Sequence, residues 1–340
     1  MSNNHNMKKT LLTLTAASAM LFACRQTGPM TVSLEPTPMI YGDSTRTAAP
    51  FAKDPTVIRM GDRYLMYYSA RGYEGECKFP GWHCAVAQSS DRINWSRVGD
   101  LDITDTKGTP IWGVIAPCTK VFDGTVHLFY QKYWDDAKNN NIWHATSSDG
   151  IHFTNTCDEP VFIAKAGWSL NRAIDAEVYR VKDKMILMFA TRDPDNKIQM
   201  LGMAEAPYGS DYGPDKWTLL SREEPFMKPE YAWEEHCIEA PTVIERKGYY
   251  YLFYAGAYNH EHQQIGLAIS SDGYHFERIN PDSAEAGLCY RSGAQGSWNA
   301  AESGHPGVFE DNDGSVWLYY QGKAKQNADY FLSVCKVDFK

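Results

Sequence analysis

The stretch DPTVIRMGDRYLMYYS, residues 54–69, carries the pattern that decides the fold. An acid and a proline precede an apolar run, and a Gly-Asp turn then leads into a second run rich in tyrosine. Turn residues between two such runs predict a β-hairpin. Four further stretches follow the same plan: APCTKVFDGTVHLFYQ from Ala116, DAEVYRVKDKMILMFA from Asp175, APTVIERKGYYYLFYA from Ala240 and HPGVFEDNDGSVWLYY from His305.

The five stretches recur at a nearly constant interval. Their second residues are separated by 62, 59, 65 and 65 positions, counted from Pro55 through Pro117, Ala176, Pro241 and Pro306. A tail follows three of the hairpins, as SSDRINW (89–95), SSDGIHF (147–153) and SSDGYHF (270–276). No segment has a convincing helical period. Because a repeat of about 60 residues rich in short strands is typical of a radial array, the sequence predicts an all-β fold, a five-bladed β-propeller.

The last repeat is shorter than the others. It ends at Lys340, directly after its third strand. We expect the segment around residues 30–40 to supply the missing fourth strand and to close the ring. Closure removes an open sheet edge, which would otherwise favour aggregation. The alternative is that this segment serves only as a tether.

The N-terminus has the pattern of an export signal. Lys8 and Lys9 precede an apolar run over residues 10–23, which is too short for a stable membrane span. The run ends in Leu-Phe-Ala-Cys, which resembles a bacterial lipobox and implies cleavage before Cys24 and lipidation of that residue. The alternative is an ordinary signal peptide with an incidental cysteine. We therefore expect a signal peptide over 1–23, a tether and closing strand over 24–48 and a propeller over 49–340, in an exported lipoprotein of the periplasm or cell surface.

Composition excludes some classes of partner. The net charge is −9, with 22% charged residues, so nucleic acid is not expected to bind. Membrane contact is expected only through the lipid at Cys24. No CxxC or His-x-x-x-His pair indicates a zinc site. Cys77 and Cys84 are the most favourable local pair for a disulfide in an oxidising compartment.

Three carboxylates stand at or beside the starts of the repeats. Asp54 and Asp175 begin their stretches, and Glu239 directly precedes Ala240. In a propeller the repeat starts converge on the axis, so the three should meet there. Glycoside hydrolysis needs one carboxyl group to protonate the leaving oxygen and another to activate water. Because Glu239 is one residue early, it needs a β-bulge or its longer side chain to reach the axis.

With these residues the chain resembles glycoside hydrolase family 43 over nearly all of the expected propeller. The matching phrases are KDPTVIRMGDRYLMYYS, RAIDAEVYRV and IEAPTVIERKGYYYLFYAG. The resemblance implies that Asp54 is the general base, Asp175 the residue that orients Glu239 and keeps its pKa high, and Glu239 the general acid. It also implies an inverting hydrolase of plant or algal oligosaccharides, of the α-L-arabinofuranoside or β-D-xyloside type, that requires no cofactor.

Further residues are candidates for the substrate site. The resemblance places His305 on the axis, where it would contact substrate and either a structural Ca²⁺ or Na⁺ ion or a water molecule behind the carboxylates. Trp112 and Trp298 are candidates for stacking on a sugar face, as are Trp82, Trp168 and Trp233. Arg172 is a candidate for hydrogen bonds to sugar hydroxyls.

Three alternatives remain open from the sequence. The first is a carbohydrate-binding lipoprotein without catalysis. The second is a propeller glycosidase of the neoagaro-oligosaccharide type, in which an axial histidine has been proposed as the acid, so that His305 is a second candidate proton donor. The third is a phosphorylase, which would need a basic pocket; only Lys53 and Arg172 lie near the repeat starts in the sequence.

Overall fold

The computed structural model describes residues 1, 28–36, 38–46, 49–71, 81–132 and 140–340. Residues 2–23 of the predicted signal peptide, Cys24 and Cys77 lie outside these residues. In the part of the chain that is described, no helix is long and apolar enough to cross a membrane. The only helical segment among those residues is a three-residue 3₁₀ turn, η2 (Ala232–Glu234).

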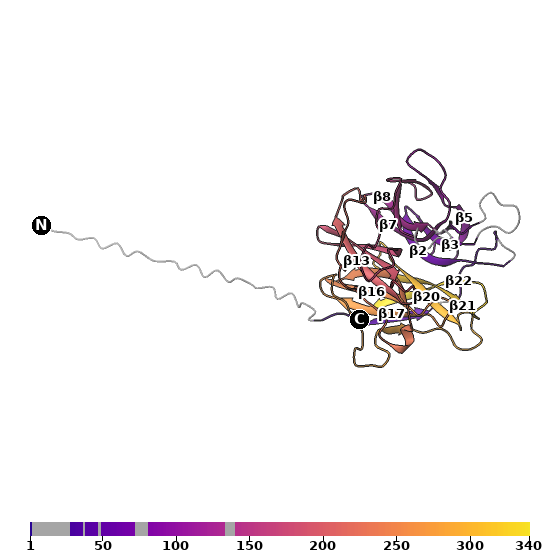
Figure 1. The fold of residues 1–340 in the computed structure, drawn as a ribbon. Coiled ribbons are helices and arrows are strands. Elements are labelled where there is room, and N and C mark those ends of the chain that lie inside the picture. The colour runs from indigo at the N-terminus through magenta and orange to yellow at the C-terminus, as the bar shows by residue number, and fades with distance from the viewer. Residues whose placement is uncertain (2–27, 37, 47–48, 72–80, 133–139) are drawn as a thin grey trace.

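Five separate and mainly antiparallel sheets make up the described fold, and we number them as blades in chain order of their first strands (Figure 1). Blade 1 contains β2 (Lys53–Met60), β3 (Arg63–Ala70), β4 (His83–Ser89) and β5 (Ser96–Asp100). Blade 2 contains β7 (Val114–Phe122), β8 (Thr125–Lys132), β9 (Ile142–Ser147) and β10 (His152–Asn155), with β6 (Asp102–Thr104) parallel to β10 at its edge. Blade 3 contains β11 (Ile174–Val181), β12 (Lys184–Arg192), β13 (Gln199–Pro207) and β14 (Thr218–Leu219).

The last two blades complete the set. Blade 4 contains β15 (Ile238–Arg246), β16 (Tyr249–Gly256), β17 (Gln264–Ser270) and β18 (Glu277–Arg278), and β19 (Leu288–Tyr290) also pairs with β17. Blade 5 contains β20 (Glu302–Glu310), β21 (Val316–Lys323), β22 (Phe331–Phe339) and β1 (Val32–Pro36). The first strands β2, β7, β11, β15 and β20 contact one another in turn, and β20 returns to β2. This closed ring of first strands confirms the predicted five-bladed propeller.

The ring is closed by the N-terminal segment. Strand β1 pairs antiparallel with β22, with Val32 opposite Phe339 and Pro36 opposite Cys335. The backbone N–H of Thr31 also donates to the carbonyl of Lys340 at 2.9 Å. The prediction of an N-terminal fourth strand is confirmed, and the alternative of a tether alone is wrong for this segment.

The predicted hairpin turns explain how each blade starts. The first two strands of blades 1 to 4 are joined by two-residue turns. In blade 2 both turn residues have positive φ, 50° at Asp123 and 78° at Gly124, as a type I′ turn requires. Lys247 and Gly248 repeat this geometry in blade 4, with φ of 51° and 83°. A glycine at the second position allows this turn without steric cost, which is why the pattern could be recognised from sequence.

The Ser-Ser-Asp tails join neighbouring blades. In each tail the first serine accepts hydrogen bonds at its Oγ from the backbone two and three residues later, as Ser147 does from Asp149 and Gly150. A tyrosine of the adjacent blade then donates to a carbonyl in the turn: Tyr67 to Gly150 at 2.7 Å, Tyr179 to Gly273 at 2.7 Å and Tyr319 to Arg92 at 3.2 Å.

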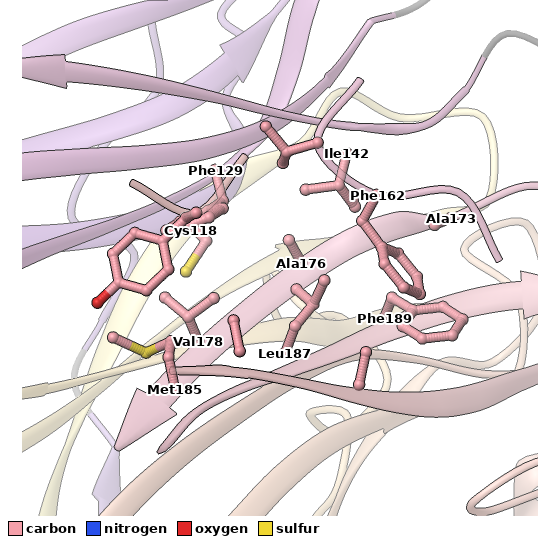
Figure 2. Close-up of a cluster of buried hydrophobic side chains, with 14 of the residues drawn as sticks. Cys118, Phe129, Ile142, Phe162, Ala173, Ala176, Val178, Met185, Leu187 and Phe189 are labelled. Carbon is pink, nitrogen blue, oxygen red and sulfur yellow. The ribbon is translucent and has the colours of Figure 1, made fainter. Parts of the chain in front are cut away.

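The hydrophobic core consists of layers between adjacent blades. Figure 2 shows one of them, between blades 2 and 3, in which Phe129 of β8 belongs to the same buried cluster as Leu187 of β12. The rings of Phe162 and Phe189 pack with centroids 4.8 Å apart. Cys84 lies fully buried in β4 as a free thiol, and its expected partner Cys77 lies outside the described residues.

Candidate active site

A β-bulge at the same point of every first strand shapes the centre of the propeller. In blade 1 the pairing with β3 shifts between Lys53 and Thr56, so that two residues of β2 oppose one residue of β3. Equivalent shifts occur in the other four first strands. Each bulge contains a residue other than glycine with positive φ, namely Asp54 (53°), Ala116 (46°), Asp175 (51°), Ala240 (49°) and His305 (44°).

The bulges explain the offset of Glu239. Alignment by bulge puts Ala240 at the position of Asp54 and Asp175, and puts Glu239 at the position of Lys53. Asp54, Asp175 and His305 are therefore equivalent residues of three blades, whereas Glu239 reaches the same region from the preceding position. The expected need for a bulge is confirmed, and the bulge is common to all five blades.

Side chains of neighbouring blades hold three of the bulges in place. The backbone N–H of Asp54 donates to Gln321 Oε1 at 3.1 Å, and that of Asp175 donates to Gln131 Oε1 at 2.7 Å. The N–H of Ala116 donates to Ser69 Oγ at 2.9 Å. Each acceptor stands on the second strand of the preceding blade around the ring, so these bonds fix one blade against the next and satisfy donors that the bulge removes from the sheet.

A cavity of about 370 Å³ opens over this ring, within the size range of small-ligand sites. Its lining includes all three predicted carboxylates, Asp54, Asp175 and Glu239, together with His305 and Arg172. The structure thus brings together residues from blades 1, 3, 4 and 5. Asp175, Glu239 and His305 are buried, with 5–8% of their surface exposed.

His305 lies between two of the carboxylates. Its Nδ1 is 3.0 Å from Asp54 Oδ1, and its Nε2 is 3.1 Å from Glu239 Oε1. Burial alone would lower the pKa of His305, but Asp54, Glu239 and Asp175 together raise it to about 9. The imidazole is therefore protonated at neutral pH, and it bridges the two carboxyl groups.

Glu239 accepts several hydrogen bonds. Gln263 Nε2 donates to its Oε1 at 2.7 Å, and Gln199 Nε2 donates to its Oε2. Burial would raise the pKa of Glu239, but the hydrogen bond and the positive charge of His305, with a further contribution from Lys53, lower it to about 2. The sequence-based expectation was that Asp175 keeps the pKa of Glu239 high. That expectation is wrong for this geometry, because the protonated His305 lies within hydrogen-bonding distance of Glu239 and stabilises its ionised form.

Asp175 is the carboxyl group whose pKa is raised. Burial, together with the negative charges of Glu239 and Asp54, outweighs the charge of His305 and raises the pKa of Asp175 to about 6. Its Oδ2 is buried, and none of the described residues donates a hydrogen bond to it. The ligand-type atoms of Asp175, Glu239 and His305 all lie within 4.8 Å of one another. Asp175 therefore influences the proton affinity of His305 at short range.

These three side chains do not form a good site for Ca²⁺. Calcium takes six to eight oxygen ligands, whereas this group offers two carboxylates and an imidazole. Both nitrogens of that imidazole already contact carboxylates, and a protonated ring repels a cation. The unpartnered Oδ2 of Asp175 can be satisfied by a water molecule. We derive no step of the chemistry through a metal ion.

The predicted substrate-binding residues separate into two groups. Arg172 and His305 line the cavity, whereas Trp112 and Trp298 do not. Trp112 precedes β7 and packs against the ring of His83, with centroids 4.7 Å apart. Trp298 packs over Gly322 and beside Tyr320, with ring centroids 5.8 Å apart, because the missing side chain of the glycine leaves room for the indole. The structure therefore places both tryptophans in packing roles outside the cavity.

The cavity is also lined by residues that the sequence did not single out, or indicated only as secondary candidates. Trp82, one of the further tryptophan candidates, lines the cavity, and so do Tyr258, Arg192 and Gln199. The glutamines were the main omission, although Gln131 and Gln321 both follow the tyrosine run of their repeat, as YQ and YYQ. A polar residue at the end of an otherwise apolar, buried strand is the sequence feature that would have indicated these glutamines.

The fold and the acids at its axial cavity define the class of propeller glycosidases. The chain belongs to glycosyl hydrolases family 43, whose family model matches residues 47–334. Comparison with curated protein sequences finds no match.

Solved structures resemble the propeller over most of its length. An endo-1,4-β-xylanase from Bacteroides thetaiotaomicron is 19% identical, with 91% of this chain and 97% of the other covered and a TM-score of 0.60. The catalytic domain of a GH62 α-L-arabinofuranosidase from Coprinopsis cinerea is 14% identical, with coverage of 91% and 98% and a TM-score of 0.65. An exo-1,5-α-L-arabinanase from a bovine ruminal metagenomic library is 15% identical, with coverage of 86% and 94% and a TM-score of 0.60. At these identities the likeness concerns the fold.

Proposed function

We propose that this family 43 protein hydrolyses an oligosaccharide with inversion at the anomeric carbon, and that its substrate is an α-L-arabinofuranoside or a β-D-xyloside. The observation that carries the proposal is the position of His305 between Asp54 and Glu239 at the floor of the cavity. An imidazole ring and two contacts of 3.0 and 3.1 Å separate the two acids. Because a whole imidazole ring spans the gap, this spacing favours the wider pair of an inverting enzyme over a retaining pair, whose carboxyl groups are only about 5–5.5 Å apart.

In the proposed step, Asp54 removes a proton from water while the water oxygen attacks the anomeric carbon. The bond to the leaving oxygen breaks, and that oxygen receives a proton through Glu239. In the ligand-free protein this proton is on His305, since the pKa of His305 is about 9 and that of Glu239 about 2, and it passes from His305 Nε2 to Glu239 Oε1 across their 3.1 Å contact as Glu239 protonates the leaving oxygen. At the end of the step Asp54 holds the proton from water and His305 is neutral. Asp175 acts as a positioning residue, because its charge contributes to the raised pKa of His305.

A product-release screen tests this proposal. Arabino-, xylo-, galacto- and agaro-oligosaccharides are incubated with the purified protein and with its Glu239→Gln variant. We expect release of a sugar by the wild type alone, and NMR of the first-formed product should show the inverted anomer. Retained configuration contradicts inversion. Binding without release by the wild type would instead indicate a carbohydrate-binding protein.

We also propose that the protein is exported from the cytoplasm and carries a lipid on Cys24. The sequence of residues 8–24 supports this proposal. In cells given a labelled fatty acid, we expect the wild-type protein to incorporate the label and the Cys24→Ser variant not to incorporate it. Equal labelling of both proteins would contradict it.

A further inference from the structure

The wall of the catalytic cavity is more basic than the chain as a whole. Of the described residues that line it, four are Lys or Arg (Lys53, Arg71, Arg172 and Arg192) and three carry carboxylates, and the protonated His305 adds a further positive charge. The complete chain has a net charge of −9. Because cavity walls of low dielectric strengthen such a local charge, the cavity favours a ligand that carries negative charge.

Two of the four cations have no carboxylate partner within the part of the chain that the structure describes. Lys53 lies 3.8 Å from Asp54, and Arg71 lies 3.3 Å from Asp329. Among the described residues, neither Arg172 nor Arg192 forms an ion pair with any acid. The Nε of Arg172 is buried, and no described residue accepts a hydrogen bond from it. Arg172 is half-buried in the cavity wall, and a buried N–H donor without an acceptor is costly, so a ligand that supplies an acceptor there is favoured.

The two arginines are held side by side on blade 3. Arg172 lies in the segment before β11, and Arg192 ends β12. The backbone N–H of Leu170 donates to the carbonyl of Arg192 at 2.8 Å, and the hydroxyls of Ser169 and Thr191 are 3.0 Å apart. Burial and the charge of Arg192 lower the pKa of Arg172, which shows that the two cations repel each other across a short distance.

Arg192 is also connected to the proposed acid. Its Nε donates to Gln199 Oε1 at 3.1 Å, and Gln199 Nε2 donates to Glu239. Its guanidinium lies over the ring of Tyr258, 4.9 Å from the centroid. A group bound by the arginines would therefore lie in the same cavity as the reacting bond, with an aromatic ring beside it.

We propose that Arg172 and Arg192 bind the carboxylate of a uronic acid residue in the substrate. The planar guanidinium presents paired N–H donors that match a carboxylate. Asp175 and Glu239 face the same cavity, so their negative charge favours a singly charged carboxylate over a doubly charged phosphate. The subsite rests on the proposed hydrolase function, and it narrows the substrate to an acidic oligosaccharide.

The test compares acidic oligosaccharides with matched neutral copies. Glucuronate-substituted xylo-oligosaccharides and galacturonate-containing oligosaccharides are each paired with a copy in which the carboxyl group has been chemically reduced to an alcohol. Binding is measured by calorimetry in an Asp54→Asn background, which prevents turnover. Arg172→Gln and Arg192→Gln are then introduced separately, and Arg63→Gln, which changes an exposed arginine of β3, serves as the matched control.

We expect at least one acidic member to bind about tenfold more tightly than its reduced copy, as one charge-assisted contact would give. The ratio of the affinity for the acidic oligosaccharide to that for its reduced copy should fall to about one in both arginine variants and should stay unchanged in Arg63→Gln. It should also weaken at high salt, while binding of the neutral copy does not. Circular dichroism confirms that each variant is folded. Equal binding of every acidic member and its reduced copy overturns the subsite.

Separate outcomes decide the subsite and the hydrolase function. Release of neutral sugars without any preference for acids overturns the subsite and leaves the hydrolase intact. Preferential binding of acids without hydrolysis of any member overturns the hydrolase and leaves the subsite intact. A titration of the protein and its arginine variants with inorganic phosphate completes the experiment. Arginine-dependent phosphate binding, with a sugar 1-phosphate as product, would overturn the assignment of a carboxylate in favour of a phosphorylase.

Discussion

Asp54, Asp175 and His305 adopt a backbone conformation that few residues other than glycine adopt. Their φ angles lie between 44° and 53°. Each such residue costs roughly 1–2 kcal/mol, and aspartate tolerates the conformation better than most. The neighbouring blades oppose this cost with hydrogen bonds to the bulged N–H groups of Asp54 and Asp175. The strain is thus located where three side chains must turn toward one point.

The proposed roles of Asp54 and Glu239 predict different responses to the leaving group. Each of Asp54→Asn and Glu239→Gln should lower kcat on natural oligosaccharides by about 10²–10⁴-fold, the usual contribution of a general base or acid. On an aryl glycoside with a strongly acidic phenol, the leaving oxygen needs no proton. Glu239→Gln should therefore regain most of its activity there, whereas Asp54→Asn should not. Steady-state kinetics on both substrate types give the answer, and equal rescue of the two variants would refute the assignment.

His305 predicts a pH-dependent contribution to stability. Its pKa is about 9 in the folded protein and about 6.5 when unfolded, so its stabilising effect is fully present below about pH 6.5 and is lost as the pH rises through 9. His305→Asn should therefore destabilise the protein by roughly 3 kcal/mol more at about pH 6 than at about pH 10. Urea unfolding at the two pH values measures this difference. The exposed His262→Asn serves as control, and an equal loss at both pH values for His305→Asn would contradict the bridging geometry.

Among the elements, the Ser-Ser-Asp turns have a second function beyond ending a strand. The turn around Gly273 accepts a hydrogen bond from Tyr179 of the neighbouring blade and packs against Val181. The same element is repeated in blades 1 and 2. A local sequence motif is therefore also a contact between sheets, which explains why its spacing is regular.

Gly273→Ala should be clearly more destabilising than Gly209→Ala. Both glycines have positive φ, 81° and 76°, so alanine costs about 1 kcal/mol or somewhat more in either place. Only at Gly273 would the added methyl group meet Val181 at 2.6 Å, and such overpacking costs a further 1–3 kcal/mol or so. Equilibrium unfolding in urea compares the two variants. Equal losses would show that the turn does not pack tightly between blades.

For the whole molecule, closure of the ring depends on five residues from the opposite end of the chain. Strand β1 covers the edge of β22 over Val32–Pro36, and Met30 is buried in the same hydrophobic cluster as Val337. Without β1, strand β22 would present unpaired backbone groups to solvent. The N-terminal segment thus contributes both to the last blade and to the solubility of the propeller.

Removal of residues 1–36 should lower the melting temperature by several degrees and increase self-association, compared with removal of residues 1–27. The second protein retains β1 and is the matched control. Thermal unfolding and sedimentation analysis measure the two effects. An unchanged melting temperature and a monomeric state for the shorter protein would show that the ring does not need this strand.

The sequence by itself determined the features that repeat or are local. The spacing of the Pro and Ala positions indicated five blades, the Asp-Gly and Lys-Gly turns indicated the hairpins, and the short last repeat indicated closure by the N-terminus. The three acids were found because each stands at or beside the start of a repeat, and repeat starts converge on a propeller axis. Such features depend only on neighbours in the chain and on a period, which one sequence displays.

Only the tertiary structure decided the charge states and the lining of the cavity. His305 lies 66 residues from Glu239 in the chain, yet their contact of 3.1 Å lowers the pKa of Glu239 and reverses the sequence-based expectation for its protonation. Trp298 lies outside the cavity and Arg192 within it, for reasons of packing between blades. Electrostatic interactions depend on distances between atoms from different blades, and side-chain direction depends on local bulges. A linear sequence specifies neither until the blades have packed.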